Sequence, residues 1–322
     1  MQTTKHCTKC GNQSYIFQKS SGRHLCKKCF ISYFERKFQK TLSKYLRFSS
    51  NDIVCVGLSG GKDSIALLYN LYLHFKHTKS PQLIAVTVDE GISNTFSMNQ
   101  QRIELFFKQT GIDIPLIQAK YKDIFGSNMD EIVRAIKENQ IKMNACTVCA
   151  SIRRRIINEI ALQNDANIIA IGHNLDDAAQ SFMMNILRGD LSKIQKTTPY
   201  SSSTENISPF LPRIKPLFQF SEEEIIRYCD AIPLPYFSKT CQYALDFPIL
   251  RKKVQTFLNE LDTRSFEYKY NIVRDHLSLS KMSSHEISNS TSKNRCSICD
   301  YPTGINRSIC TYCEFKQLFE KI

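Results

Sequence analysis

The sequence lacks any long hydrophobic run. No stretch of its 322 residues approaches the ~20 uninterrupted apolar residues that a membrane-spanning helix requires. The opening residues, MQTTKHCTKC, also lack the apolar core of a secretory signal. Hydrophobic residues make up 42% of the chain and charged residues 23%, as in a globular protein. We therefore expect a cytosolic protein without a membrane segment, built as one sizeable α/β domain with small appendages.

Acidic residues are scarce, above all in the first part of the chain. The formal net charge is +13, and in residues 1–48 Glu35 is the only acid. The same segment contains eleven basic residues, namely Lys5, Lys9, Lys19, Arg23, Lys27, Lys28, Arg36, Lys37, Lys40, Lys44 and Arg47. Such a cluster attracts polyanions and suits contacts to a phosphate backbone. The alternative is a solvated, lysine-rich surface without a partner.

The thirteen cysteines are paired mostly as CxxC, a pattern that indicates metal binding in a reducing compartment. Two CxxC knuckles can complete a tetrahedron of thiolates around zinc and leave no open coordination position. The sequence therefore predicts two structural Zn²⁺ sites. Their ligands would be Cys7, Cys10, Cys26 and Cys29 in the first site, and Cys296, Cys299, Cys310 and Cys313 in the second.

Between these quartets, strand-like and helix-like segments alternate, which predicts a doubly wound parallel sheet with helices on both faces. We expect four regions: a zinc module with a basic helix (1–48), a catalytic domain (49–277), a Ser/Asn-rich linker (278–294) and a zinc ribbon (295–322). The helix of the first module has Phe30, Tyr33, Phe34 and Phe38 at helical spacing. We interpret this stripe as a docking face rather than as a base-stacking platform.

The segment SGGKDS lies between a predicted strand and a predicted helix. Its members are Ser59, Gly60, Gly61, Lys62, Asp63 and Ser64. Two glycines let the backbone approach phosphate oxygens, and the helix N-terminus directs N–H groups at an anion. The segment lacks the GxxxxGK[ST] pattern of P-loop NTPases. It nevertheless predicts a phosphate-binding loop, and ATP is the expected ligand.

A second polar segment, GHNLDD, follows another predicted strand. Its residues Gly172, His173, Asn174, Asp176 and Asp177 should lie at the carboxyl edge of the sheet, where ligands bind in open α/β folds. The carboxylates could hold Mg²⁺ that bridges ATP phosphates. They could also cap the following helix, a role that is compatible with catalysis.

Three further cysteines are candidates for chemistry. Cys146 and Cys149 form a lone CxxC, and Cys241 stands far from them in the sequence. Three thiolates suggest an iron–sulfur cluster with one iron left without a protein ligand, because four would complete an ordinary 4Fe-4S site. The alternative is a persulfide on one cysteine with a resolving partner. We expect Cys55 and Cys229 to be small buried residues.

Together these segments resemble the tRNA 2-thiolation group of the PP-loop ATP pyrophosphatase superfamily, which includes TtuA-like enzymes and the eukaryotic cytoplasmic thiolation subunit. The resemblance covers nearly the whole chain. It rests on SGGKDS, VDEGI (88–92), CTVC (146–149), GHNLDDAAQSFMMNILRGD (172–190), LPYFSKTCQYA (234–244) and the last quartet.

The resemblance implies site roles. Asp176 would be the acid or base, Asp63 would lie nearer the nucleotide, and Asp89 would contact adenine or ribose. Cys146, Cys149 and Cys241 would hold a 4Fe-4S cluster. The chain departs from the pattern at Ala150, commonly Gly, and at Arg153, where TtuA-like enzymes carry a catalytic Lys. Because Arg stays protonated, we assign Arg153 to substrate or phosphate binding.

The expected reaction is ATP-dependent 2-thiolation of a tRNA uridine, with the wobble uridine favoured over one in the T-loop. The expected sulfur donor is sulfide or a ubiquitin-like protein with a C-terminal thiocarboxylate. The resemblance also suggests a homodimer or a partner subunit. Two alternatives remain open: a ligase of the lysidine synthetase type, in which an amine is the nucleophile, and a non-catalytic, zinc-dependent RNA-binding scaffold.

Overall fold

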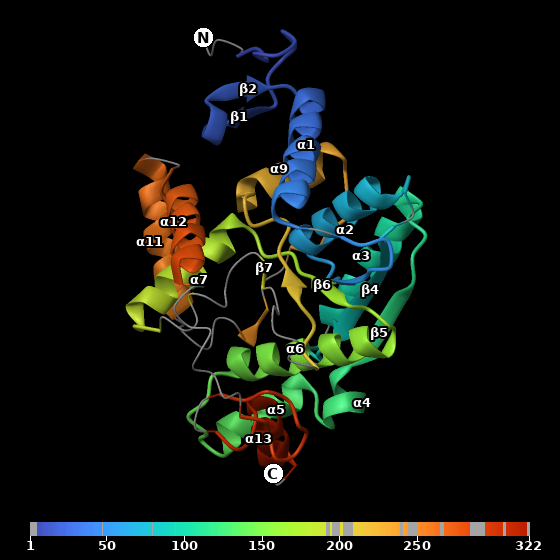
Figure 1. Ribbon diagram of the computed structural model, residues 1–322, viewed down its shortest axis with the longest axis vertical. Coiled ribbons are helices and arrows are strands. Elements are labelled where there is room, and N and C mark those ends of the chain that lie inside the picture. Colours follow the sequence, from blue (N-terminus) through green and yellow to red (C-terminus); the bar gives the residue numbers. More distant parts are fainter. Residues whose placement is uncertain are drawn as a thin grey trace.

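The computed structural model describes residues 5–46, 48–78, 80–93, 95–190, 194, 200–201, 209–238, 241–243, 250–264, 267–283, 294–304 and 307–320. A largely parallel sheet lies in the middle of the molecule, and the N-terminal and C-terminal cysteine modules lie at opposite ends (Figure 1). The predicted fold class is confirmed.

The central sheet has the strand order β5-β4-β3-β6-β8-β7. Its strands are β3 (Ile53–Gly57), β4 (Gln82–Asp89), β5 (Leu116–Lys120), β6 (Ile168–Ala170), β7 (Tyr200–Ser201) and β8 (Arg213–Ile214). All neighbours pair in parallel except β7 and β8. The chain moves outward from β3 to β5 and then returns to the other side of β3 with β6. The carboxyl ends of β3 and β6 therefore form a topological switch point, the usual place for a ligand.

Helices cover both faces of the sheet because successive strand side chains point to opposite sides. Val54 and Val56 pack with the helix α2 (Lys62–Phe75), whereas Cys55 packs with residues of α6 (Ala145–Gln163) on the other face. The remaining helices of this domain are α3 (Thr95–Thr110), α4 (Tyr121–Phe125), α5 (Met129–Glu138), α7 (Leu175–Leu187) and α9 (Glu222–Ala231). Cys55 and Cys229 are fully buried, as predicted.

The first module docks on the catalytic domain through the predicted aromatic stripe. It consists of the hairpin β1 (Ile16–Gln18) and β2 (Arg23–Leu25), joined by a short 3-10 turn (Lys19–Ser21), and of helix α1 (Lys27–Tyr45). Phe30, Phe34 and Phe38 are buried. The Phe34 ring stacks on Tyr228 of α9 with a centroid distance of 3.9 Å. This contact confirms the interpretation of the stripe as a docking face.

Two helices follow the sheet, and the second of them extends into the segment that we expected to be a linker. Helices α11 (Leu250–Arg264) and α12 (Glu267–Ser283) contact each other and pack on α7 (Figure 1). Helix α12 continues to Ser283, so the predicted linker cannot begin at residue 278; its remaining residues 284–293 lie outside the described part of the chain. The polar residues at 278–283 belong to a helix that is held by its neighbours, and composition alone does not show this.

The C-terminal module docks on α6. Its helix α13 (Thr311–Phe319) contacts α6, and Phe315 and Phe319 are buried there. The guanidinium carbon of Arg155 lies 3.0 Å from the centroid of the Tyr301 ring. Among the described helices, none is both long and apolar enough to cross a bilayer.

Candidate functional site

The phosphate loop connects β3 to α2, and a side chain of the loop is hydrogen-bonded to its backbone. The Ser64 hydroxyl accepts a hydrogen bond from the Ser59 N–H at 3.1 Å and donates one to the Gly61 carbonyl at 3.0 Å. Gly60 has a φ of 77°, a left-handed conformation that favours glycine. The loop therefore presents backbone N–H groups at the start of a helix, as the sequence predicted for an anion site.

Gly172 allows the end of β6 to approach this loop closely. A Cβ atom at Gly172 would lie 2.9 Å from the carbonyl carbon of Asp63, so any larger residue would push the end of β6 away from the start of α2. The contact brings the predicted GHNLDD segment next to the start of α2. Asn174 caps α7, and its Nδ2 donates to Asp63 Oδ1 at 3.0 Å.

Two carboxylates lie beside the Lys62 ammonium. Its Nζ lies 3.0 Å from Asp63 Oδ2 and 2.8 Å from Glu222 Oε1. Although burial opposes it, the Asp63 and Glu222 carboxylates raise the pKa of Lys62. Asp177 completes the α7 capping box and accepts a hydrogen bond from Arg251 at 3.2 Å. Burial raises the pKa of both Asp63 and Asp177, as expected for two carboxylates that face one site.

Asp176 is held in a buried ion pair, whereas its predicted role as acid or base needs access to the substrate. Its side chain is buried, Oδ1 lies 2.6 Å from the Lys269 ammonium, and Oδ2 accepts the Glu222 N–H at 2.8 Å. Lys269 is itself bound to Asp262 at 2.7 Å. With both oxygens engaged on the α12 side, Asp176 holds α7, α9 and α12 together. Its neighbour Asp177 interacts electrostatically with Lys62 and Asp63, which makes Asp177 a second candidate for the acid or base role predicted for Asp176.

A group of cations lies beside the carboxyl ends of β6 and β8. It consists of Arg154, Arg213, Lys215 and Arg251, with His173 among them. Burial and these cations lower the pKa of His173 to about 3, so its imidazole is neutral at pH 7. Burial and the neighbouring Arg154 lower the pKa of Lys215 to about 8. Cations that repel one another in this way favour an anionic ligand.

The CxxC pair occupies the N-terminus of α6. Asn144 caps this helix by accepting a hydrogen bond from the Cys146 N–H at 2.9 Å. One turn later, Arg153 Nη2 lies 3.1 Å from Cys149 Sγ, and its Nε lies 2.9 Å from Glu90 Oε1. Tyr121 donates to the Cys149 carbonyl at 2.7 Å. Arg153 therefore contacts a thiol group of the predicted trio.

Cys241 lies beside this pair although it is distant in the sequence. It packs against the apolar cluster that contains Cys149. Burial raises the pKa of Cys146, and the negative charges of Cys241 and Cys149 raise it further. The fold thus brings together the three cysteines that the sequence singled out. Asp89 ends β4 and accepts the Gly91 N–H at 2.8 Å, which shapes the turn that carries Glu90.

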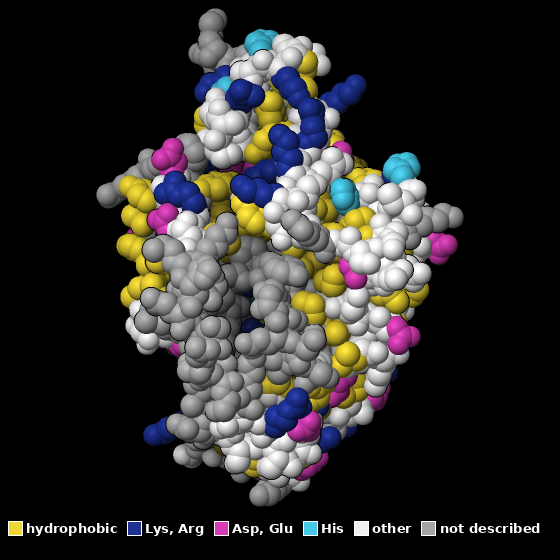
Figure 2. Space-filling model, viewed as in Figure 1, with side chains coloured by type: hydrophobic (Ala, Val, Ile, Leu, Met, Phe, Trp, Pro, Cys, Tyr) yellow, Lys and Arg dark blue, Asp and Glu magenta, His cyan; other side chains and the backbone are white. Residues whose placement is uncertain are grey.

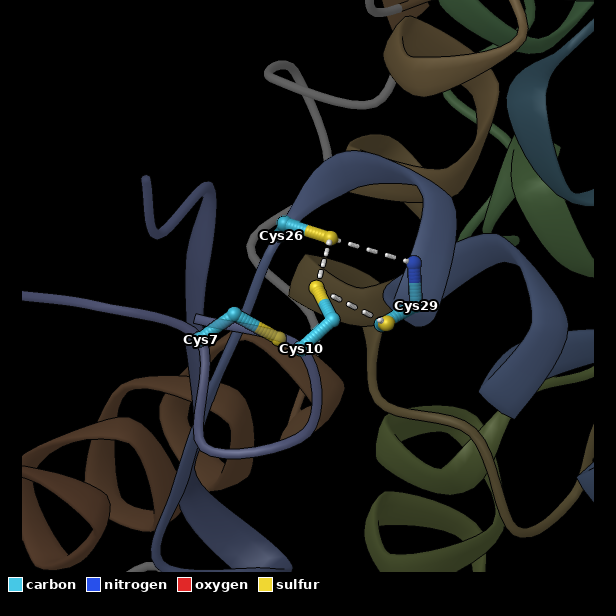
Figure 3. Close-up of side chains that lie close together, drawn as sticks. All are labelled: Cys7, Cys10, Cys26 and Cys29. Atoms are coloured by element: carbon cyan, nitrogen blue, oxygen red, sulfur yellow. Dashed lines mark hydrogen bonds between the residues drawn. The ribbon is translucent and has the colours of Figure 1, made fainter. Parts of the chain in front are cut away.

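Each predicted zinc quartet is assembled in a form that could hold one metal ion. In both, the four sulfur atoms lie within 4.8 Å of one another. Figure 3 shows the first quartet, in which the sulfurs of Cys7, Cys10, Cys26 and Cys29 point toward one another from the β1–β2 module and the start of α1. The Cys10 and Cys26 sulfurs are 3.5 Å apart, and in the second quartet the Cys299 and Cys310 sulfurs are 3.6 Å apart.

Sequence reasoning missed several residues of the site: Glu90, Arg213, Lys215, Glu222, Arg251 and Lys269. Arg213 lies in a two-residue strand between prolines and Lys215 directly follows it, and such a strand has no visible periodicity. Glu222 and Lys269 reach the site only through helices that pack from distant parts of the chain.

Comparisons with known proteins agree with this geometry. A model of the PP-loop domain matches residues 32–261, and a model of the N-terminal LIM domain of the 2-thiouridine synthetase TtuA matches residues 6–31. A probable sulfurtransferase of Methanocaldococcus jannaschii is 33% identical over 95% of this chain and 86% of its own length. Cytoplasmic tRNA 2-thiolation protein 1 of Danio rerio is 32% identical over 80% of this chain and 73% of its own length.

A solved structure is similar over almost the entire chain. The U34-tRNA thiolase NcsA from Methanococcus maripaludis, determined with its 4Fe-4S cluster, superposes with a TM-score of 0.78 at 32% sequence identity. The superposition covers 99% of this chain and 97% of NcsA.

Proposed function

Because the chain belongs to the PP-loop family of tRNA 2-thiolation proteins, we propose that it catalyses ATP-dependent 2-thiolation of the wobble uridine of tRNA. The proposal is supported by the meeting of a phosphate loop and three cysteines at one edge of the sheet. The wobble position follows the specificity that is named for the similar thiolase from Methanococcus maripaludis.

The phosphate loop would bind the ATP phosphates, and the uridine O2 would attack the α-phosphate. This step forms an O2–P bond and releases pyrophosphate. Sulfur then attacks C2, the C2–O2 bond breaks, and AMP leaves with the former uridine oxygen. Lys62 would neutralise charge on the phosphates, and Asp63 would hold Mg²⁺ beside them. His173, which is neutral at pH 7, and Asp89 would make the other predicted contacts to the nucleotide.

We assign the acid or base role to Asp177 rather than to Asp176. Its carboxylate interacts electrostatically with Lys62 and with Asp63, whereas Asp176 is buried in an ion pair with Lys269. Burial raises the pKa of Asp177, which favours a proton-transfer role at the uridine N3–C2–O2 edge.

The three thiolates fit an iron–sulfur cluster better than a single ion. Unlike the quartets, they do not form a group whose sulfurs all lie within 4.8 Å of one another in the described residues, and a cluster is wider than an ion. A 4Fe-4S cluster bound by Cys146, Cys149 and Cys241 would supply an open iron that holds the sulfide. Arg153 would offset the negative charge of the thiolates and orient the sulfur toward the substrate.

The two quartets fit Zn²⁺. A tetrahedron with Zn–S bonds of about 2.3 Å has sulfur–sulfur edges of about 3.8 Å. The distances of 3.5 and 3.6 Å between the sulfurs described above are close to this value. Both sites would be structural, because each is closed by four cysteines.

Basic residues on two surfaces would bind the tRNA backbone. Figure 2 shows Lys and Arg side chains gathered over the first module and α1, where Lys28, Arg36, Lys40 and Lys44 are exposed. The cations beside β6 and β8 would hold phosphates close to the target uridine. Binding should therefore weaken steeply with salt. We further propose a cytoplasmic location and a sulfide or thiocarboxylate donor.

An anaerobic assay tests the reaction. Cluster-reconstituted protein is incubated with unmodified tRNA, Mg-ATP and sulfide, and the nucleosides are analysed by mass spectrometry. We expect 2-thiouridine that requires ATP and is lost in Cys146→Ala and Cys241→Ala. The matched control is Cys55→Ala, which removes a buried thiol outside the trio and should remain active.

Absence of the thiolated nucleoside, despite four bound irons and bound ATP, would contradict the proposal. An equally active Cys241→Ala protein would contradict the cluster assignment alone. Sequencing of the modified tRNA would show whether the wobble uridine or a T-loop uridine is the acceptor.

A further inference from the structure

The segment that leads to Cys241 is bonded to the phosphate loop. The Phe237 N–H donates to the Gly60 carbonyl at 2.8 Å, and Gly61 and Phe237 form an isolated parallel β-bridge. Both glycines belong to SGGKDS. The backbone at Phe237, which is 177 residues after Gly60 in the sequence, thus pairs with this loop.

Cys241 follows this bridge after only four residues. Because an extended chain spans at most about 3.6 Å per residue, the Cα atom of Cys241 lies within roughly 14 Å of Phe237. Cys241 is therefore tethered to the loop at close range.

A second tether follows Cys241. Tyr243 Oη donates to Asp130 Oδ1 at 2.6 Å, and Asp130 Oδ2 accepts the Ser93 N–H at 3.1 Å. Ser93 closes the turn that begins at Glu90, the residue that binds Arg153 and through it Cys149. The chain before Cys241 is thus hydrogen-bonded to the phosphate loop at Phe237. The chain after it is hydrogen-bonded, through Tyr243, to the elements that hold the CxxC pair.

From this arrangement we propose that Phe237 and Tyr243 are positioning residues, through which a nucleotide on the phosphate loop fixes Cys241 beside Cys146 and Cys149. The inference rests on the proposed function, since it takes the loop as the ATP site and Cys241 as the third thiolate. Phosphate binding restricts a glycine-containing loop, and a segment hydrogen-bonded to that loop then opens less often.

The same coupling must act in both directions. If the nucleotide stabilises the hydrogen bond between the Phe237 N–H and the Gly60 carbonyl, then loss of this bond must weaken nucleotide binding by the same factor. One neutral hydrogen bond sets the scale, so we expect a factor of roughly three to ten.

Alkylation of Cys241 tests the proposal without the cluster. Full-length, iron-free protein reacts with iodoacetamide in the presence and absence of a saturating, non-hydrolysable Mg-ATP analogue, and the Cys241 peptide is quantified by mass spectrometry. In the wild type, the analogue should slow alkylation roughly three- to tenfold. Phe237→Ala retains the N–H group and should behave alike, whereas Phe237→Pro removes it and should lose the effect.

Two further measurements keep the test decisive if Phe237→Pro does not fold. Hydrogen exchange at the wild-type Phe237 amide should slow when the analogue binds. Tyr243→Phe, which removes only the hydroxyl, should raise the rate of Cys241 alkylation without nucleotide while the protection by nucleotide persists.

Unchanged alkylation and unchanged amide exchange in the wild type at saturating analogue would overturn the proposal, as would full protection in a folded Phe237→Pro protein. Two outcomes distinguish a failure of the positioning role from a failure of the proposed function. Intact tRNA thiolation without coupled alkylation removes only the positioning role. Coupled alkylation together with an active Cys241→Ala protein removes only the cluster assignment.

Discussion

Lys269 should be among the most costly residues to replace, although we place it outside the chemistry. It is 5% exposed, and its ammonium holds Asp176, which is 7% exposed, at 2.6 Å and Asp262 at 2.7 Å. Lys269→Met would leave a buried carboxylate without its cation. Breaking a buried pair in this way costs about 3–5 kcal/mol. For a catalytic domain of this size, the loss corresponds to a fall in Tm of roughly 6–20 °C.

A double-mutant cycle separates the ion pair from general packing. In Lys269→Met/Asp176→Asn both members are neutral, so the double variant should regain about 1–3 kcal/mol relative to the sum of the single variants. Thermal unfolding of zinc-loaded, nucleotide-free protein measures each corner. Single costs that add within about 0.5 kcal/mol, or a cost below 1 kcal/mol for Lys269→Met, would refute the reasoning.

Three other predictions concern the site. Asp177→Asn should lower kcat at least ~100-fold, and its loss of Tm should be smaller than that of Asp176→Asn, which breaks the buried pair with Lys269; single-turnover rates and melting curves check this. Arg155 lies 3.6 Å from Cys299 Sγ, so Arg155→Met should speed metal loss to a chelator roughly 10–100-fold at the second quartet only, with the first quartet as internal control. Because the pKa of Lys215 is lowered to about 8, tRNA affinity should be constant below that pH and should fall above it. Lys215→Arg, measured by filter binding across the pH range, should flatten this fall.

Local patterns were sufficient to predict the main elements of the sheet and of both cysteine modules. Strand runs such as Ile53–Gly57 are bounded by polar or glycine residues, and the CxxC spacing indicates a metal knuckle wherever it occurs. The aromatic stripe of α1 also carries its own signal, because buried side chains recur at helical spacing. These predictions depend on residues that are close in the sequence.

The sequence does not show which of the two carboxylates, Asp176 or Asp177, faces the phosphate loop. Asp176 and Asp177 are adjacent at the start of a helix, and either could cap it or face a ligand. The choice depends on Lys269, which is 93 residues away, and on the Glu222 N–H, which is 46 residues away. Neither contact leaves a periodic trace. The α11–α12 hairpin therefore supports the site, although the composition of its last residues, from 278 on, is that of a linker.

Glu222 gives the last prediction, because it connects this scaffold to the phosphate loop. Its N–H group is held by Asp176, while its carboxylate lies 2.8 Å from Lys62. A triphosphate must draw Lys62 away from that carboxylate and also experiences its repulsion. Glu222 is 45% exposed, so the pair is worth no more than about 1 kcal/mol, or roughly fivefold in affinity.

Glu222→Gln should therefore tighten ATP binding about two- to fivefold in equilibrium dialysis, since the amide keeps the backbone contact to Asp176 but not the charge. The neighbouring Glu223→Gln is the matched control, because Glu223 pairs with Lys19 and should leave ATP affinity unchanged. If Glu222→Gln instead weakens ATP binding while the control does not, then the Glu222 carboxylate assists the Mg-nucleotide, and the competition for Lys62 is not what limits binding.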